Sequence, residues 1–192
     1  MSGRVLLYGA AGRSGRALAA ALADLGERLV LAGRSPEARV PRAAASGRES
    51  RVLRADADMA DGLRDIGLLL NAAGPFAGTA DAVIGACLEA RVDYMDIAGE
   101  WPVFANAELQ DGEATERGVM LLPGVGFAVA VTDCALALAA ARMPGVVRLR
   151  LGLSRPHGLS RGSRATMMTM NDSAVRVRRG GVLRSVNWHS TP

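Results

Sequence analysis

Three glycines lie at a spacing of three residues near the start of the chain, at Gly9, Gly12 and Gly15. Four apolar residues precede them, and an alanine-rich segment with helical character follows. Between a strand and a helix, this spacing permits a tight turn, close approach of a pyrophosphate and close helix packing. The N–H groups at the helix start would face the phosphates. The pattern predicts a dinucleotide-binding loop made of Gly9, Ala10, Ala11, Gly12, Arg13, Ser14 and Gly15; a flexible turn is the alternative.

A second polar segment follows the next apolar run. An NAD site usually has an acid here for the ribose 2′-hydroxyl, about 20 residues beyond the glycines. This chain instead has Arg34 and Ser35, with Glu37 as the nearest acid. An arginine can hold a 2′-phosphate through charge-assisted hydrogen bonds, and Arg13 could reach the same group. The segment favours NADP(H) over NAD, with a solvated Arg34 as the alternative.

Two further segments would border the same ligand. Asp56 follows the third apolar run and could meet an adenine amine, or it could cap a turn. The sequence NAAGPF at 71–76 ends the fourth run, where ligands bind in open α/β sheets. We expect contact with the ribose and nicotinamide half from Asn71, Ala72, Ala73, Gly74 and Pro75.

Two carboxylates follow the fifth apolar run. Asp96 and Glu100 would lie near the reactive end of the cofactor, where a carboxylate can orient substrate or relay a proton. Helix capping is the competing interpretation for Glu100, because Pro102 follows it in a predicted first turn. Tyr94 precedes Asp96 by two residues, so both side chains point to one face of a strand. Gly124, after the sixth run, is expected to let the backbone pass close to the nicotinamide.

One segment near the end of the chain resembles a substrate site. Ser160, Arg161 and Gly162 precede a predicted helix near 163–175, and free N–H groups there could bind an anionic or carbonyl oxygen. His157 lies close by and is more simply a solvated loop residue.

Apolar runs alternate with helical patterns over about 140 residues, which predicts βαβ units and a parallel sheet covered on both faces. The fold class is therefore α/β, a Rossmann-type doubly wound sheet followed by the start of a second α/β domain. The composition shifts at MPG, residues 143–145. We place a Rossmann domain at 1–145 and an incomplete substrate or oligomerisation domain at 146–192. The strands are expected at 4–8, 28–32, 51–55, 67–71, 92–97, 118–122 and 146–153, and the helices at 14–25, 58–65, 79–90, 103–117 and 131–142.

Composition and charge exclude several classes of protein. The chain has 192 residues, 49% of them hydrophobic, and no apolar run long enough for a membrane span. Two cysteines and two histidines give no metal-ligand cluster, and we expect a cytoplasmic protein with free thiols. Residues 148–192 carry nine arginines and one acid, but they are dispersed and have one aromatic among them. We therefore expect an acidic partner surface or an anionic substrate, and no nucleic acid.

The motifs together resemble the saccharopine dehydrogenase-like family, in its NADP-binding reductase branch that includes trans-acting enoyl reductases. The segments that carry the resemblance are GAAGRSG at 9–15, AGRS at 32–35, NAAGPF at 71–76, YMDIAGE at 94–100, PGVGF at 123–127, TDCALALAA at 132–140 and SRGSRATM at 160–167. The resemblance implies an NADPH-dependent Rossmann domain followed by an α/β domain that shapes the substrate site, with a homodimer as a possible assembly. Members of the family usually run longer, so the second domain is expected to be cut short.

Two functions follow from these observations. The first is NADPH-dependent transfer of a hydride to a C=C, C=O or C=N bond of a small or lipid-like substrate. The chain contains no lysine, which argues against lysine-dependent saccharopine chemistry and excludes a Tyr-x-x-x-Lys pair. The alternative is an NADP-binding sensor or regulator, or a fragment that binds NADP without turnover.

Overall fold

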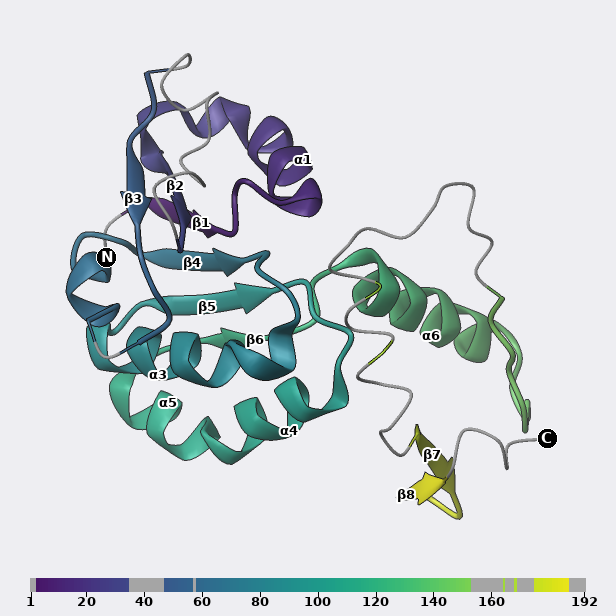
Figure 1. Cartoon of the computed structure of the whole chain (residues 1–192). Coiled ribbons are helices and arrows are strands. Elements are labelled where there is room, and N and C mark those ends of the chain that lie inside the picture. The colour runs from purple at the N-terminus through teal and green to yellow at the C-terminus, as the bar shows by residue number, and fades with distance from the viewer. Residues whose placement is uncertain are drawn as a thin grey trace.

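A six-stranded parallel sheet forms the centre of the computed structural model, which describes residues 3–34, 47–56, 58–152, 164, 168 and 175–186. The strand order is β3-β2-β1-β4-β5-β6 (Figure 1). Strands β2 and β3 are added on one side of β1 and strands β4 to β6 on the other, so the strand order reverses between β1 and β4. This is the doubly wound Rossmann order that the sequence predicted. The strands are β1 (Val5–Tyr8), β2 (Leu29–Gly33), β3 (Ser50–Val52), β4 (Leu68–Asn71), β5 (Asp93–Asp96) and β6 (Leu121–Leu122).

Helices pack on both faces of the sheet and bury a separate apolar cluster on each. One cluster joins Leu7, Leu31 and Leu70 to Leu18 of α1 (Arg13–Ala21). The other joins Leu6, Val30 and Leu69 to the helices that follow β4 and β5. These helices are α3 (Ala80–Ala90), α4 (Trp101–Leu109) and α5 (Asp111–Arg117), and 3-10 helices span Ala23–Arg28 (η1), Ala60–Leu63 (η3) and Phe76–Gly78 (η4).

The alternation of side chains along β1 explains why its four residues need no polar face. Leu6 and Tyr8 enter one cluster and Leu7 enters the other, and all three are at most 3% exposed. Burying one such side chain contributes roughly 1.5–3 kcal/mol. The central strand therefore positions its carboxyl end, where the glycine loop begins, through packing on both sides.

Several element boundaries differ from those predicted. The helix expected at 103–117 is two helices, α4 and α5, separated at Gln110, where the backbone leaves the helical region (φ −96°, ψ 4°). The helix expected at 131–142 is α6 (Thr132–Arg142), and a π-helical turn at Phe127–Val131 precedes it. The helix expected at 58–65 is only the short 3-10 helix η3.

The chain after α6 differs most from the prediction. Residues 146–152 form neither strand nor helix where a strand was expected at 146–153. A hairpin of β7 (Val175–Arg179) and β8 (Val182–Val186) forms a separate two-stranded antiparallel sheet. Its turn consists of Gly180 and Gly181 at φ +58° and +79°, a backbone shape that tight hairpins require and glycine adopts freely. The Gly-Gly pair between valine-containing runs was a signal for this hairpin that the sequence analysis missed.

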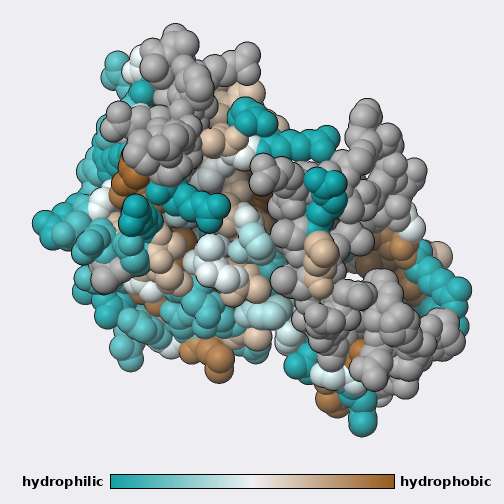
Figure 2. All heavy atoms as spheres, in the orientation of Figure 1, coloured by the Kyte–Doolittle hydropathy of each residue, from teal (hydrophilic) through white to brown (hydrophobic). Residues whose placement is uncertain are grey.

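The surface around α6 is partly apolar. Phe127, Val131 and Leu138 are 68%, 52% and 59% exposed. Figure 2 shows hydrophobic surface in the part of the molecule that holds α6. In the described part of the chain, no helix combines the length and the apolar character that crossing a bilayer requires.

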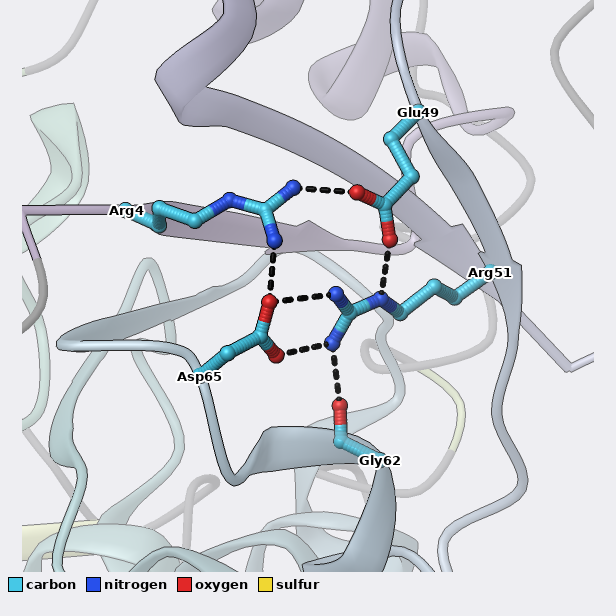
Figure 3. A network of polar contacts seen from close by, with 5 residues as sticks. All are labelled: Arg4, Glu49, Arg51, Gly62 and Asp65. Carbon is cyan, nitrogen blue, oxygen red and sulfur yellow. Dashed lines mark hydrogen bonds and ion pairs between the residues drawn. The ribbon is translucent and has the colours of Figure 1, made fainter.

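The amino edge of the sheet is held by an ionic network (Figure 3). Arg51 of β3 donates hydrogen bonds to both carboxylate oxygens of Asp65, at 2.7 and 2.8 Å, and to Glu49 at 2.7 Å. Arg4, just before β1, contacts the same two carboxylates. The hydrogen bonds from Arg51 hold the pKa of Asp65 at about 2, and those from Arg4 and Arg51 lower the pKa of Glu49. The network ties the starts of β1, β3 and β4 together.

Candidate functional site

The first loop of the predicted site lies at the carboxyl end of β1. Gly9 has φ +82°, a conformation that residues with a side chain rarely adopt. A Cβ at Gly9 would lie 2.8 Å from the N atom of Ala73, in the segment after β4. The two loops that the sequence assigned to the cofactor are therefore in backbone contact, at the position where the strand order reverses.

The start of α1 is built for close approach. A Cβ at Gly15 would lie 2.2 Å from the carbonyl oxygen of Gly9, so only glycine lets the helix begin this near the strand. Gly12 is the N-cap and supplies no side chain to cover the first turn. Arg16 donates a hydrogen bond to the carbonyl of Ala11 at 2.5 Å, which fixes the loop between them. A bare backbone turn leading into a helix N-terminus fits the diphosphate of a dinucleotide.

The segment after β4 is held at several points. The N–H of Ala72 donates to the carbonyl of Tyr8 at 2.8 Å, and the N–H of Ala73 donates to Oδ1 of Asn71 at 2.9 Å. Thr79 is the N-cap of α3, but its hydroxyl donates to the carbonyls of Ala73 and Pro75 and not to the first turn of the helix. Its side chain therefore restrains the preceding loop, which includes the cis Gly74–Pro75 bond.

Glu100 reaches this segment from a different loop. It is the N-cap residue of α4, as its sequence position indicated, but its carboxylate makes no hydrogen bond to the first turn of that helix. Instead Oε1 accepts the N–H of Phe76 at 3.1 Å and Oε2 accepts the N–H of Ala77 at 2.7 Å. The residue is 3% exposed. Glu100 therefore binds the start of η4 as an internal anion.

Asp96 is the centre of a second buried cluster. Its Oδ1 accepts the N–H groups of Ala98 at 2.9 Å and Gly124 at 2.8 Å, and its Oδ2 accepts the Tyr94 hydroxyl at 2.7 Å. The expected orientation of Tyr94 and Asp96 to one face of the strand is confirmed. Asn71 donates to the Tyr94 oxygen at 3.3 Å, so the ends of β4 and β5 and the loop after β6 are joined.

Burial controls the ionisation of Tyr94 in this cluster. Tyr94 is fully buried, and desolvation, together with the adjacent Asp96 charge, raises the pKa of its phenol. The hydroxyl therefore stays protonated at physiological pH and remains a hydrogen-bond donor to Asp96. The arrangement fixes the position of the carboxylate.

The side of the site near β2 and β3 carries opposite charges around Tyr8. Burial raises the pKa of Tyr8, the charge of Arg34 lowers it, and the charge of Asp56 raises it. Arg34 directly follows β2, Asp56 lies in the segment after β3, and both are exposed. The charges of two residues that the sequence assigned to the adenosine half therefore both act on Tyr8. Tyr8 was not among the predicted site residues, because its apolar surroundings resemble those of any core residue.

A comparison of sequences decides the family. Residues 5–122 match the family model of the saccharopine dehydrogenase NADP-binding domain. The chain belongs to this family. Its cofactor is accordingly NADP(H), and the glycine loop, the segment after β4 and the Rossmann order all lie within the matched residues.

Individual proteins with similar sequences or structures are consistent with membership of this family. Two proteins of Mycobacterium tuberculosis, provisionally named trans-acting enoyl reductases, are 30% identical over 134 residues. The match covers 64% of this chain and 32% of each relative, so the chain spans about a third of their length. Apo saccharopine dehydrogenase (L-Glu forming) from Saccharomyces cerevisiae shares the fold, with a TM-score of 0.57 and 15% identity, over 72% of this chain and 31% of that one.

Some of the residues predicted for the site lie outside the part of the chain that the structure describes. These are Ser35 of the 2′-phosphate segment and Ser160, Arg161 and Gly162 of the substrate segment. Arg13 and Ser14 are exposed in the first turn of α1, and Gly124 is buried with φ +79°. Within the described ranges, no group of three or more His, Cys, Asp or Glu residues could hold a metal ion.

Proposed function

We propose that this chain is the NADPH-binding part of an oxidoreductase that reduces a C=C, C=O or C=N bond of a small or lipid-like substrate. The backbone contact between Gly9 and Ala73 carries the proposal, because it supports a single binding site formed by both predicted cofactor loops. Ligands of doubly wound sheets bind in the crevice where the strand order reverses. The family match supports NADP(H) as the ligand of that crevice.

Each part of the proposed site would have a separate task. NADPH, when bound, supplies the hydride. The first turn of α1 would hold the diphosphate, and Arg34 would bind the 2′-phosphate. Residues 72–76 would line the ribose and nicotinamide half. Direct catalytic roles for Asp96 and Glu100 stay predictions, as do the substrate segment 160–162, the domain boundary at 145, the homodimer and the cytoplasmic location.

A second function has one observation in its favour. Both oxygens of the Glu100 carboxylate and both of the Asp96 carboxylate already accept hydrogen bonds from this chain. A protein that binds NADP(H) to sense it needs no proton relay, so these contacts also suit a sensor or a regulator. NADPH consumption with a panel of enoyl, carbonyl and imino compounds separates the two functions. Turnover supports the enzyme, whereas tight binding without turnover supports the sensor.

The 2′-phosphate role is tested by nucleotide titration of Arg34→Ala. Loss of a charge-assisted hydrogen bond weakens binding by roughly 1.5 kcal/mol or more, so we expect the Kd for NADPH to rise about tenfold or more. The Kd for NADH should change less than about twofold on the same free-energy scale. Arg28→Ala is the matched control, because Arg28 is exposed at the opposite end of β2. Equal weakening of both nucleotides would remove Arg34 from the proposal.

A further inference from the structure

Glu100 offers an inference that goes beyond the proposed function while resting on it. We propose that Glu100 is a positioning residue, which sets the affinity for the nicotinamide half of the dinucleotide by holding residues 72–77 against Gly9. It acts through the loop and contributes no group to the cofactor itself. The proposal starts from an unusual contact: a buried carboxylate after β5 binds two main-chain N–H groups that follow β4.

The carboxylate completes a set of restraints on one loop. Asn71 holds the N–H of Ala73, and the Thr79 hydroxyl holds the carbonyls of Ala73 and Pro75. Glu100 holds the N–H groups of Phe76 and Ala77, at the far end of the loop. These two N–H groups begin a 3-10 helix, where no preceding carbonyl pairs with them. Without the carboxylate the N–H of Phe76, a buried residue, would lose its acceptor.

The position of the loop determines which half of the ligand depends on it. The backbone of Ala73 in this loop fills the space that a side chain at Gly9 would occupy. The loop after β4 and the glycine loop after β1 are therefore packed against each other. Doubly wound sheets bind the two mononucleotide halves on the two sides of the reversal point. Glu100, Thr79 and residues 72–77 belong to the β4–β6 side, whereas Arg34 and Asp56 belong to the β2–β3 side. A displaced loop should therefore weaken the nicotinamide half selectively.

Glu100→Gln tests the role with little change in volume. The glutamine oxygen can accept one of the two N–H groups, but its NH2 group faces the other and cannot accept it. We expect the Kd for NADPH to rise about tenfold, since one of the two hydrogen bonds to the loop is lost and the other is no longer charge-assisted. The Kd for 2′,5′-ADP, which has the phosphorylated adenosine and lacks the nicotinamide, should change less than about twofold.

The ratio of these two constants is the decisive measurement, because general destabilisation would weaken both ligands alike. Glu108→Gln is the matched control: Glu108 is exposed on α4, the helix that Glu100 precedes, and this variant should bind both ligands like the wild type. Equal weakening of both ligands by Glu100→Gln, or no weakening of either, overturns the positioning role. A wild-type chain that binds neither ligand overturns the proposed function, and this inference with it.

A second variant keeps the proposal falsifiable if Glu100→Gln fails to fold. Thr79→Val is nearly isosteric and removes the hydroxyl that holds the loop from the other side. We expect a smaller selective rise, about threefold in the Kd for NADPH, because neutral hydrogen bonds are worth less than charged ones. Unchanged affinity for NADPH in Thr79→Val would show that loop restraint does not set binding, and would overturn the proposal.

Discussion

The two edges of the central sheet are both held by carboxylates, but in different ways. At the amino edge, the side chains of Glu49 and Asp65 are 44% and 48% exposed and pair with arginines. At the carboxyl edge, Asp96 and Glu100 are 0% and 3% exposed and pair mainly with main-chain N–H groups. Each carboxylate joins segments that are distant in the sequence. Only the second pair does so inside the protein.

The contribution of the amino edge to stability should depend on pH and salt, whereas the geometry of the carboxyl edge should depend on them much less. Exposed ion pairs are screened by water and salt and contribute little. Buried carboxylates bound by fixed donors are screened much less, and losing one leaves its donors unpaired. The edge that we propose as the cofactor site thus has the restraints that depend less on solution conditions. The following changes test this contrast, from the largest expected effect to the smallest.

Asp96→Ala should be the most damaging substitution. It leaves the N–H groups of Ala98 and Gly124 and the Tyr94 hydroxyl without their acceptor. Each unpaired buried donor costs roughly 1–3 kcal/mol, so we expect a loss of about 4 kcal/mol in urea unfolding. Asp96→Asn keeps an acceptor for the two N–H groups and should lose about half as much. A loss below about 1 kcal/mol for the alanine variant would contradict the role given to Asp96.

Gly9→Ala should come next. The substitution forces a side chain into φ +82° and places its Cβ 2.8 Å from the Ala73 backbone. Strain and overpacking together predict a loss of about 3 kcal/mol, measured by urea unfolding. Gly85→Ala is the control: within the described residues a Cβ there meets no atom within 4 Å, and Gly85 lies inside α3. It should stabilise the protein by about 0.5–1 kcal/mol. Equal effects at both positions would refute the close contact.

Asp65→Asn tests the amino edge. At neutral pH we expect a loss of about 1 kcal/mol, because the carboxylate is half-exposed and its ion pairs are screened. The folded pKa of about 2 lies below the unfolded value, so this contribution is complete above about pH 4 and is lost as the pH falls towards 2.

The pH dependence of urea unfolding checks this prediction for wild type and variant. The two free energies of unfolding should converge near pH 2. Asp61→Asn is the control, since its pair with Arg64 is about three-quarters exposed, and it should change stability by less than about 0.5 kcal/mol. A difference for Asp65→Asn that persists at pH 2 would contradict the ionic origin.

Salt gives the smallest effect and the clearest contrast. At about 1 M salt the screening length falls to about 3 Å, so most of the loss caused by Asp65→Asn should disappear. The loss caused by Asp96→Ala should stay nearly constant, because its donors are uncharged and buried. Urea unfolding of both variants at low and high salt measures the two responses. Parallel responses would show that the edges do not differ as described.

Much of the fold could be predicted because the relevant signals are local. Alternating apolar runs and helical patterns gave the order of strands and helices up to residue 142. The spacing of Gly9, Gly12 and Gly15 gave the first crossover, where a Cβ at Gly15 would meet the Gly9 carbonyl. The two-residue period of strands placed Tyr94 and Asp96 on one face.

The restraints on the site could not be predicted, because they depend on which strand ends meet and in what register. Glu100 looked like a cap for its own helix, yet it binds N–H groups more than twenty positions earlier in the chain. Thr79 starts the segment 79–90 that the sequence predicted as a helix, but its hydroxyl donates to the preceding loop. Nothing within a few residues of either side chain distinguishes these contacts from ordinary helix capping.

The central place of β1 has a consequence for the order of folding. Its pairing with β2 joins Val5 to Leu29, whereas its pairing with β4 joins Val5 to Leu68, much further along the chain. Loop closure of that length is slow compared with local pairing. The backbone contact between Gly9 and Ala73 can form only after β1 has paired with β4. Binding of NADPH during refolding should therefore begin only after β1 and β4 have paired. The rate at which binding appears would then report when the two halves of the sheet join.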